Sequence, residues 1–437
     1  MRLRHFLAVS AVAAATALAA PAFAQTHPEF VQLGRVSATI YKPDSGPAPH
    51  VAFMISHRSA NNLNNVACRE LSKRGFMAVC FNTRFVNNDS IVDWEKIPLD
   101  VKVAVEYARK EPGITKVILL GHSGGSPLMS FYQAVAENGV GYCQGPNKIV
   151  PCGNDLAGMK PADGLLFAEA HPGDGAQALR GINPSISIVD GKTRVDPALD
   201  PFNPKNGFNP EGASHYPPEF RNRYYAAQSK VMNDQLAQVL AKQERMKKGD
   251  GVYPDDDIVL VPFSDQEGAA RLDLMDPSIP EFMSTARPEK LLKNDGSIVM
   301  QVVKSMEPAH PGQAKLNRTF EAGTKILTIK SYLSANAVRS TNSADGIDHC
   351  SNNNSTICAV QSIKVPTLIA AMGAYHMLRD EEAMYDKSAA TDKDYVVIEG
   401  AELNYTACKE CETTPGQYSN SLRNLFDYIR DWTNKRF

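Results

Sequence analysis

The stretch that decides the fold of this chain reads Val117-Ile118-Leu119-Leu120-Gly121-His122-Ser123-Gly124-Gly125-Ser126-Pro127-Leu128-Met129. Four apolar residues precede a Gly-x-Ser-x-Gly pattern, and a segment compatible with a helix follows it. A serine in this arrangement lies on a tight turn between a strand and a helix, where a neighbouring Cβ would clash with the returning chain. The pattern predicts that Ser123 is a nucleophile held over the carboxyl end of a strand. A glycine-rich turn that only closes a strand is the alternative.

Apolar strands alternate with helical segments on both sides of this turn. The predicted strands are 36–41, 51–55, 77–81, 116–120, 164–169, 365–372 and 395–398. The predicted helices are 65–74, 99–110, 126–137, 381–388 and 419–433. Strands that are apolar throughout and separated by helices are typical of a parallel sheet covered on both faces. We therefore expect an α/β protein with a mostly parallel central sheet and helices on both faces.

The segment 183–362 interrupts this alternation. Its first part is rich in Pro, Asn, Gly and Asp, and a long helical pattern follows over 218–248. At 437 residues, the chain also exceeds one domain of ordinary size. We predict an α/β core formed by 25–182 and 363–437, with 183–362 inserted as a cap.

The N-terminal residues have the pattern of a secretory signal. Arg2 and Arg4 precede an apolar stretch, and Ala22-Phe23-Ala24 is the small-x-small pattern of a cleavage site. The apolar stretch is too short to anchor the chain in a membrane. We expect residues 1–24 to be removed and the mature chain to begin near Gln25. The product would be secreted or periplasmic in a bacterium, without stable membrane insertion.

The eight cysteines suggest disulfides, because their number is even and an exported chain meets an oxidising compartment. Local spacing predicts three pairs and leaves a fourth by elimination. The predicted pairs are Cys143 with Cys152, Cys350 with Cys358, Cys408 with Cys411, and Cys68 with Cys80. A redox or metal role for Cys408-x-x-Cys411 is the alternative, but the sequence has no second such pair and no histidine near it.

The overall charge argues against one class of partner. The formal net charge is −2 at pH 7, so no electrostatic basis for binding nucleic acid exists. Hydrophobic residues make up 43% of the chain, which is ample for a large core. The oligomeric state cannot be read from these features.

Together, these features resemble the α/β-hydrolase fold family. The resemblance rests on the turn Gly121–Gly125, on His57-Arg58-Ser59 after a strand, and on the late strand Val365-Pro366-Thr367-Leu368-Ile369. It covers 25–182 and 363–437, and the insertion stands where that family carries its cap. The resemblance implies a secreted serine hydrolase, similar to esterases and lipases, that cleaves a small-molecule ester or lactone through an acyl-enzyme on Ser123 and without a cofactor.

The resemblance also implies an oxyanion hole built from two backbone N–H groups. One belongs to Gly124, which follows the nucleophile. The other comes from the turn after the third strand, where we choose Ser59, with Arg58 as the alternative. Arg58 could also point into the pocket and favour a substrate with a carboxylate, or be an ordinary ion-paired arginine.

The chain departs from the family at the histidine. The family order is nucleophile, acid, histidine, and its histidine follows the last strand. Here Leu403 stands near that place, and no histidine follows His376. We predict His376 as the base, because the loop after 365–372 opens at the same sheet edge as Ser123. The alternative histidines are His171 at that edge, His310 and His349 in the insertion, and His122 within the turn.

The carboxylate that orients the base is predicted to be Glu169. It ends the strand beside the nucleophile strand, and a carboxylate among apolar residues is costly to bury without a partner. Glu402 is the second choice, which would serve if acid and base have exchanged loops, and Asp380 lies just past His376. A structural ion pair is the alternative role for Glu169. An incomplete triad would instead fit a non-catalytic binding protein of the same fold.

Overall fold

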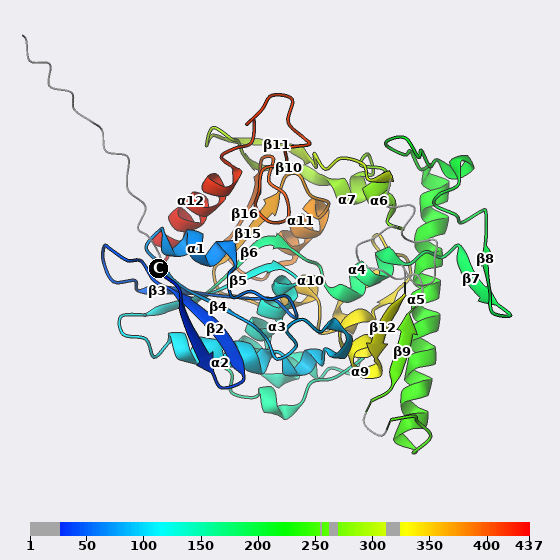
Figure 1. Ribbon diagram of the computed structural model, residues 1–437, viewed down its shortest axis with the longest axis horizontal. Helices are drawn as coiled ribbons and strands as arrows, with labels where there is room; N and C mark the ends of the chain where they lie inside the picture. The colour runs from blue at the N-terminus through cyan, green and yellow to red at the C-terminus, as the bar shows by residue number, and fades with distance from the viewer. Residues whose placement is uncertain (1–26, 254–255, 262–269, 312–323) are drawn as a thin grey trace, which may run out of the picture.

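The computed structural model describes residues 27–253, 256–261, 270–311 and 324–437, so the predicted signal segment 1–24 lies outside the described residues. Its centre is a sheet of ten strands in the order β1-β2-β4-β3-β5-β6-β15-β16-β10-β11 (Figure 1). These strands are β1 (Glu29–Leu33), β2 (Val36–Tyr41), β3 (Val51–Ser56), β4 (Met77–Phe81), β5 (Lys116–Ser123), β6 (Gly164–Ala170), β10 (Ser284–Leu292), β11 (Ile298–Lys304), β15 (Thr367–Met372) and β16 (Lys393–Ile398).

The mostly parallel sheet predicted from the sequence is confirmed. Every neighbouring pair from β4 to β10 runs parallel, and only the pairs at the two edges, which involve β1, β2 and β11, run antiparallel. All seven predicted strands are present within three residues at either end. The strands β1, β10 and β11 were not predicted.

Helices cover both faces of the sheet because successive side chains of each strand point to opposite sides. In β3, Phe53 and Ile55 pack with α1 and α12, whereas Ala52 and Met54 pack with the helices of the other face. The first face carries α1 (Val66–Ser72) and α12 (Ser421–Asn434), which lie side by side (Figure 1). The second face carries α2 (Pro98–Ala108), α3 (Gly125–Asn138), α10 (Thr356–Ala359) and α11 (Leu378–Lys387).

The segment 183–362 forms most of a second body beside the sheet (Figure 1). The helix predicted over 218–248 is α5, and its apolar residues lie in two further hydrophobic clusters. This body contains α4 (Asp174–Gly181), α5 (Pro218–Lys247), α6 (Leu272–Met275), α7 (Pro280–Met283), α9 (Ile329–Ser331), and the two-stranded sheets β7 (Ile186–Val189) with β8 (Lys192–Val195), β9 (Ile258–Val261) with β12 (Lys325–Thr328), and β13 (Arg339–Ser340) with β14 (Ile347–Asp348). The hairpin β10–β11 also falls within 183–362, yet β10 pairs with β16 of the central sheet. Only part of the inserted segment therefore lies apart from that sheet.

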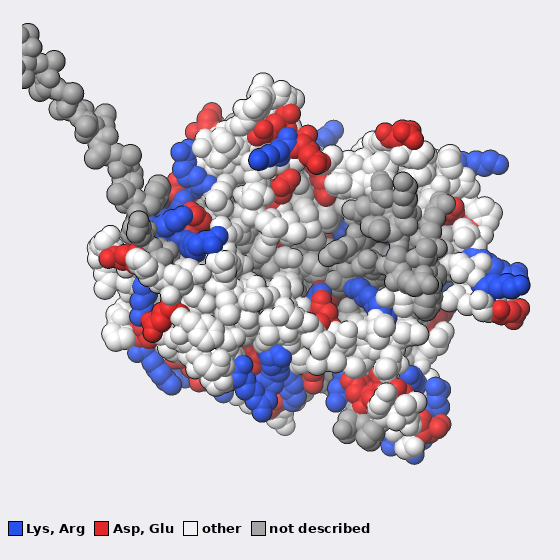
Figure 2. All heavy atoms as spheres, in the orientation of Figure 1, with Lys and Arg blue, Asp and Glu red and all other residues white. Residues whose placement is uncertain are grey.

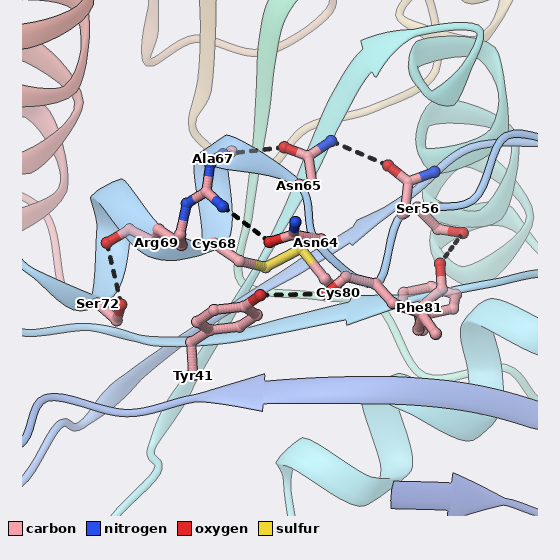
Figure 3. The surroundings of a disulfide bond; sticks show 12 residues. Tyr41, Ser56, Asn64, Asn65, Ala67, Cys68, Arg69, Ser72, Cys80 and Phe81 are labelled. Carbon is pink, nitrogen blue, oxygen red and sulfur yellow. Dashed lines mark hydrogen bonds between the residues drawn. A yellow bond between two sulfur atoms is a disulfide. The ribbon is translucent and has the colours of Figure 1, made fainter. Parts of the chain in front are cut away.

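The eight cysteines lie in the four predicted pairs, three of them predicted from spacing and one by elimination. The Cα atoms within each pair are 5.1 to 6.2 Å apart, a separation compatible with disulfide bonds. Figure 3 shows the pair that joins α1 to β4, Cys68 with Cys80. Beside it, the Asn65 side chain accepts a hydrogen bond of 2.9 Å from the backbone N–H of Ala67 and caps the start of α1.

The surface carries charges of both signs. On the face drawn in Figure 2, Lys and Arg side chains are interspersed with Asp and Glu, and no extended patch of one sign is visible. Within the described ranges, no helix has both the length and the apolar character needed to cross a membrane.

Candidate active site

Ser123 lies at the junction of β5 and α3 in a backbone conformation that L residues rarely adopt. Its φ is +50°, in the left-handed region. The glycines of the motif are required by close backbone contacts. A Cβ on Gly125 would lie 2.2 Å from the carbonyl oxygen of Ser56, and a Cβ on Gly121 would lie 2.5 Å from the Cα of Ser126. The strand, the strained serine and the helix together form the turn that the sequence predicts.

A cavity of about 660 Å³ lies above this turn. Several of the predicted site residues share it, because they follow strands that end at the same edge of the sheet. The residues that line it include Ser123, Gly124, Ser59, Arg58, His57, His171, His310, Glu307 and His376. The structure therefore brings the predicted nucleophile, the predicted base and the predicted oxyanion residues to one cavity.

His376 is held by a carboxylate that the sequence does not mark. Its Nδ1 lies 2.8 Å from Oε2 of Glu307, which follows β11. Burial acts to raise the pKa of Glu307, but the His376 and His310 imidazoles outweigh it and lower that pKa to about 2. Glu307 is thus a carboxylate at neutral pH. An Nδ1 that donates to a carboxylate leaves the Nε2 of a neutral imidazole able to accept a proton.

The loop that carries Glu307 is pinned to the loop that carries His376. The backbone N–H of Met306 donates to the carbonyl of Gly373 at 2.9 Å, and the backbone N–H of Glu307 donates to Ser305 Oγ at 3.1 Å. On the other side, Nε2 of His310 lies 3.5 Å from Oε1 of Glu307, and this contact raises the pKa of His310. In the sequence, the local indication of this carboxylate–histidine contact is that His310 follows Glu307 by three residues.

Glu169 is buried within β6, one residue before the strand ends, and it forms no ion pair with a described residue. Its side chain is 1% exposed, its φ is +60°, and neither carboxyl oxygen has a hydrogen-bond partner among the described residues. Burial raises its pKa well above the usual value, and the nearby Glu381 and Glu307 act in the same direction, whereas the nearby backbone N–H of Ser123 acts in the opposite direction. Burial therefore favours the protonated form of this group, and among the described residues no hydrogen bond joins it to an imidazole.

The remaining candidate carboxylates have other partners. Glu402 accepts a hydrogen bond from Thr406 Oγ1 at 3.1 Å and lines a neighbouring cavity rather than the one that holds Ser123. Asp380 forms a buried ion pair with Arg180.

The remaining histidines are engaged elsewhere. His122 lies with Nε2 2.8 Å from the carbonyl oxygen of Leu403, so the position where the family carries its histidine is occupied by a residue that holds His122. His171 lines the cavity and accepts from the backbone N–H of Gly173, and burial followed by Arg58 lowers its pKa well below the usual value. His349 lines a different cavity.

The turn after β3 is also engaged in contacts of its own. The backbone N–H of Ser59 donates to Nδ1 of His57 at 3.2 Å. Arg58 forms ion pairs with Asp89 and with the buried Asp174. Of the two readings of Arg58 from the sequence, the structure shows an ion-paired arginine whose side chain also lines the cavity.

The described residues contain no group of three or more His, Cys, Asp or Glu side chains arranged to hold a metal ion. The lining of the cavity includes a serine on a strained turn and a histidine–carboxylate pair.

The order of the central sheet and the strained serine after β5 define an α/β-hydrolase fold, as the sequence resemblance implies. No family model matches the chain, and no curated protein matches it. Among solved structures, it is similar to the α/β-hydrolase GrgF from Penicillium sp. sh18, with 9% identity over 94% of this chain and 99% of the other and a TM-score of 0.43. It is also similar to brefeldin A esterase, a bacterial homologue of human hormone-sensitive lipase, with 12% identity over 98% of this chain and 81% of the other and a TM-score of 0.41.

A third similar structure is a monoglyceride lipase from Saccharomyces cerevisiae. The identity is 11%, the match covers 94% of this chain and 95% of the other, and the TM-score is 0.41.

Proposed function

We propose that this chain is an exported serine hydrolase that cleaves a carboxylic ester or lactone through an acyl-enzyme on Ser123. The observation that supports this most is that Ser123, on its strained turn, lines one cavity with His376, whose Nδ1 is held by Glu307. Along the chain these residues follow the order nucleophile, acid, histidine, which is the order of the α/β-hydrolase family. Glu307 replaces Glu169 as our choice for the orienting carboxylate.

Each residue has one task in the proposed reaction. Ser123 Oγ attacks the substrate carbonyl while His376 Nε2 takes its proton. The backbone N–H of Gly124 donates to the oxyanion that forms, and Glu307 stabilises the transient imidazolium. When the tetrahedral intermediate collapses, His376 returns the proton to the departing alcohol. A water molecule, deprotonated by His376, then releases the acyl group, and no cofactor takes part.

An active-site probe tests this proposal. A fluorophosphonate should label the wild-type protein at neutral pH, and the label should vanish in Ser123→Ala. Turnover of a p-nitrophenyl ester of a short acid should disappear in the same variant. Absence of labelling in a folded wild-type protein would contradict the proposal.

The second candidate is a binding protein of the same fold that does not turn its ligand over. The observation that favours it is Leu403, whose carbonyl holds His122 where the family carries its histidine. The probe separates the two functions, because a binding protein would take no label while still binding an ester in the cavity.

A further inference from the structure

The imidazole of His57 reaches from the end of β3 to the residue that follows the nucleophile. A Cβ built on Gly124 would lie 2.5 Å from Nε2 of His57. It would lie 3.1 Å from Cε1 and 3.2 Å from Cδ2 of the same ring. Both residues line the cavity that holds Ser123. The Nε2 edge of the ring therefore packs against Gly124, and only a glycine leaves room for it.

The position of the proton on this ring is fixed by the backbone. Nδ1 of His57 accepts hydrogen bonds from the backbone N–H groups of Ser59 at 3.2 Å and of Ala60 at 3.0 Å. A ring nitrogen that accepts carries no proton, so the proton of the neutral imidazole is on Nε2. Burial, with help from Arg58 and His122, lowers the pKa of His57 to about 3, and Asp89 opposes this only weakly. The ring is therefore neutral over the working range of pH.

These contacts also bear on which group of the turn after β3 can donate to an oxyanion. The N–H of Ser59, which the sequence predicts as the second oxyanion donor, is directed at the His57 ring. That ring in turn carries a single N–H, at Nε2, beside Gly124. Because this nitrogen already holds a proton, His57 cannot accept one from Ser123, and the base remains His376.

We propose that His57 is a catalytic residue, whose Nε2–H donates to the oxyanion of the tetrahedral intermediate together with the backbone N–H of Gly124. This inference rests on the proposed function of Ser123. The proton stays on Nε2 throughout, and the imidazole acts as a neutral donor held rigid by the two backbone amides. A pre-oriented donor of this kind acts mainly on the transition state, because the ground-state carbonyl oxygen carries less charge.

Two amide side chains of different length test the inference. In His57→Gln the amide nitrogen can take the place of Nε2, while the amide oxygen can accept from Ser59 and Ala60. In His57→Asn the same acceptor is available, but the shorter side chain does not reach Gly124. We expect kcat of the Asn variant to fall by about 10²–10³-fold with KM nearly unchanged, and kcat of the Gln variant to stay within about tenfold of the wild type.

The matched control is His349→Gln, which replaces a partly buried imidazole outside this cavity and should leave kcat unchanged. Circular dichroism and thermal unfolding establish that each variant is folded. The rate of fluorophosphonate labelling should fall in parallel with kcat, because phosphonylation also places charge on the oxygen.

Wild-type kcat in folded His57→Asn would overturn the inference, and so would an equal loss in the Asn and Gln variants. If Ser123→Ala is inactive in the same experiment, the proposed function stands although His57 has no part in it. A folded wild-type protein that takes no label and hydrolyses no ester would overturn the proposed function instead.

Discussion

The turn around Ser123 depends on the absence of side chains at its glycines, and Gly125 is the strictest case. A methyl group there would meet a backbone oxygen at 2.2 Å, and a backbone atom held within β3 cannot move aside as a flexible side chain can. We predict that Gly125→Ala costs about 1–3 kcal/mol or more of stability and removes esterase activity. Gly141→Ala, where a Cβ would meet no atom within 4 Å, is the control and should behave as the wild type. Urea unfolding and ester turnover check both.

Substitutions of the two candidate carboxylates, Glu307 and Glu169, are expected to have different effects on activity. Glu307 is ionised and contacts His376, so Glu307→Gln should lower kcat by about 10³–10⁴-fold by removing the charge that orients and stabilises the imidazole. Burial raises the pKa of Glu169 well above its usual value, and no described imidazole forms a hydrogen bond with it, so Glu169→Gln should keep kcat near the wild-type value. Steady-state kinetics of the two variants decide between them. The reverse pattern would return the role to Glu169.

Glu169 should also leave a signature in the pH dependence of stability. Its pKa is raised in the folded state, so the folded protein keeps a proton that the unfolded chain releases above its ordinary pKa of about 4.3. The wild type therefore loses stability from this group as pH rises above that value. We predict that Glu169→Gln is more stable than the wild type at pH 7 and that the difference shrinks toward pH 4. Equal differences at both pH values, measured by urea unfolding, would contradict the assignment.

The proposed nucleophile could be predicted from the sequence because its requirements are local, and the proposed orienting carboxylate could not because its requirements are distant. The strand, the serine and the glycines of the turn lie within a single short stretch. Glu307, by contrast, is brought to His376 by strand pairing between segments far apart in the chain. The prediction for Glu169 rests on the cost of burying a carboxylate without a partner, but burial can instead raise the pKa of the group, as it does here.

At the scale of elements, the hairpin β10–β11 connects the inserted segment to the site. It extends the sheet beyond β16 through the pairs Leu291 with Val397 and Leu292 with Ile398, and the chain that leaves β11 delivers Glu307. The sequence of β11 is apolar on both faces, although most of its residues are exposed at the sheet edge. The periodicity of a sequence indicates which residues are apolar, but it does not indicate which strand a segment will pair with. The pairing of this hairpin with the central sheet could therefore not be predicted, and its residues fall within the segment predicted as the cap.

The cysteine pairs close loops of different length, so their removal should lower the stability of the fold by measurably different amounts. The pair Cys68–Cys80 ties α1 to β4 across 12 residues, whereas Cys408–Cys411 spans only 3. By the loop-entropy relation, we predict a loss of about 3 kcal/mol for Cys68→Ala with Cys80→Ala, against about 2 kcal/mol for Cys408→Ala with Cys411→Ala. Both sulfurs of the first pair are in the core, so the cavity left behind adds to its cost. Thermal unfolding without reductant checks the order, and a larger loss in the second pair would contradict it.

At the scale of the whole molecule, the N-terminal pattern and the cysteine pairing point to the same compartment. All eight cysteines lie in pairs at disulfide distance, and disulfides persist where the environment is oxidising. The Ala22-Phe23-Ala24 pattern predicts that export removes the residues before Gln25. A bacterium that exports the chain should therefore hold a product with an oxidised framework and a new N-terminus.

We predict that the protein purified from the periplasm begins at Gln25 and takes up no thiol reagent until it is reduced under denaturing conditions, when eight cysteines become labelled. Intact-mass spectrometry with and without reduction measures both properties in one sample. The control is the same chain produced without residues 1–24 in a reducing cytoplasm, where thiols stay open to labelling. Because the four pairs stabilise the fold that positions Ser123, this cytoplasmic form should also unfold at a lower temperature. Retention of residues 1–24 would contradict export, and labelling of the unreduced periplasmic protein would contradict the pairing.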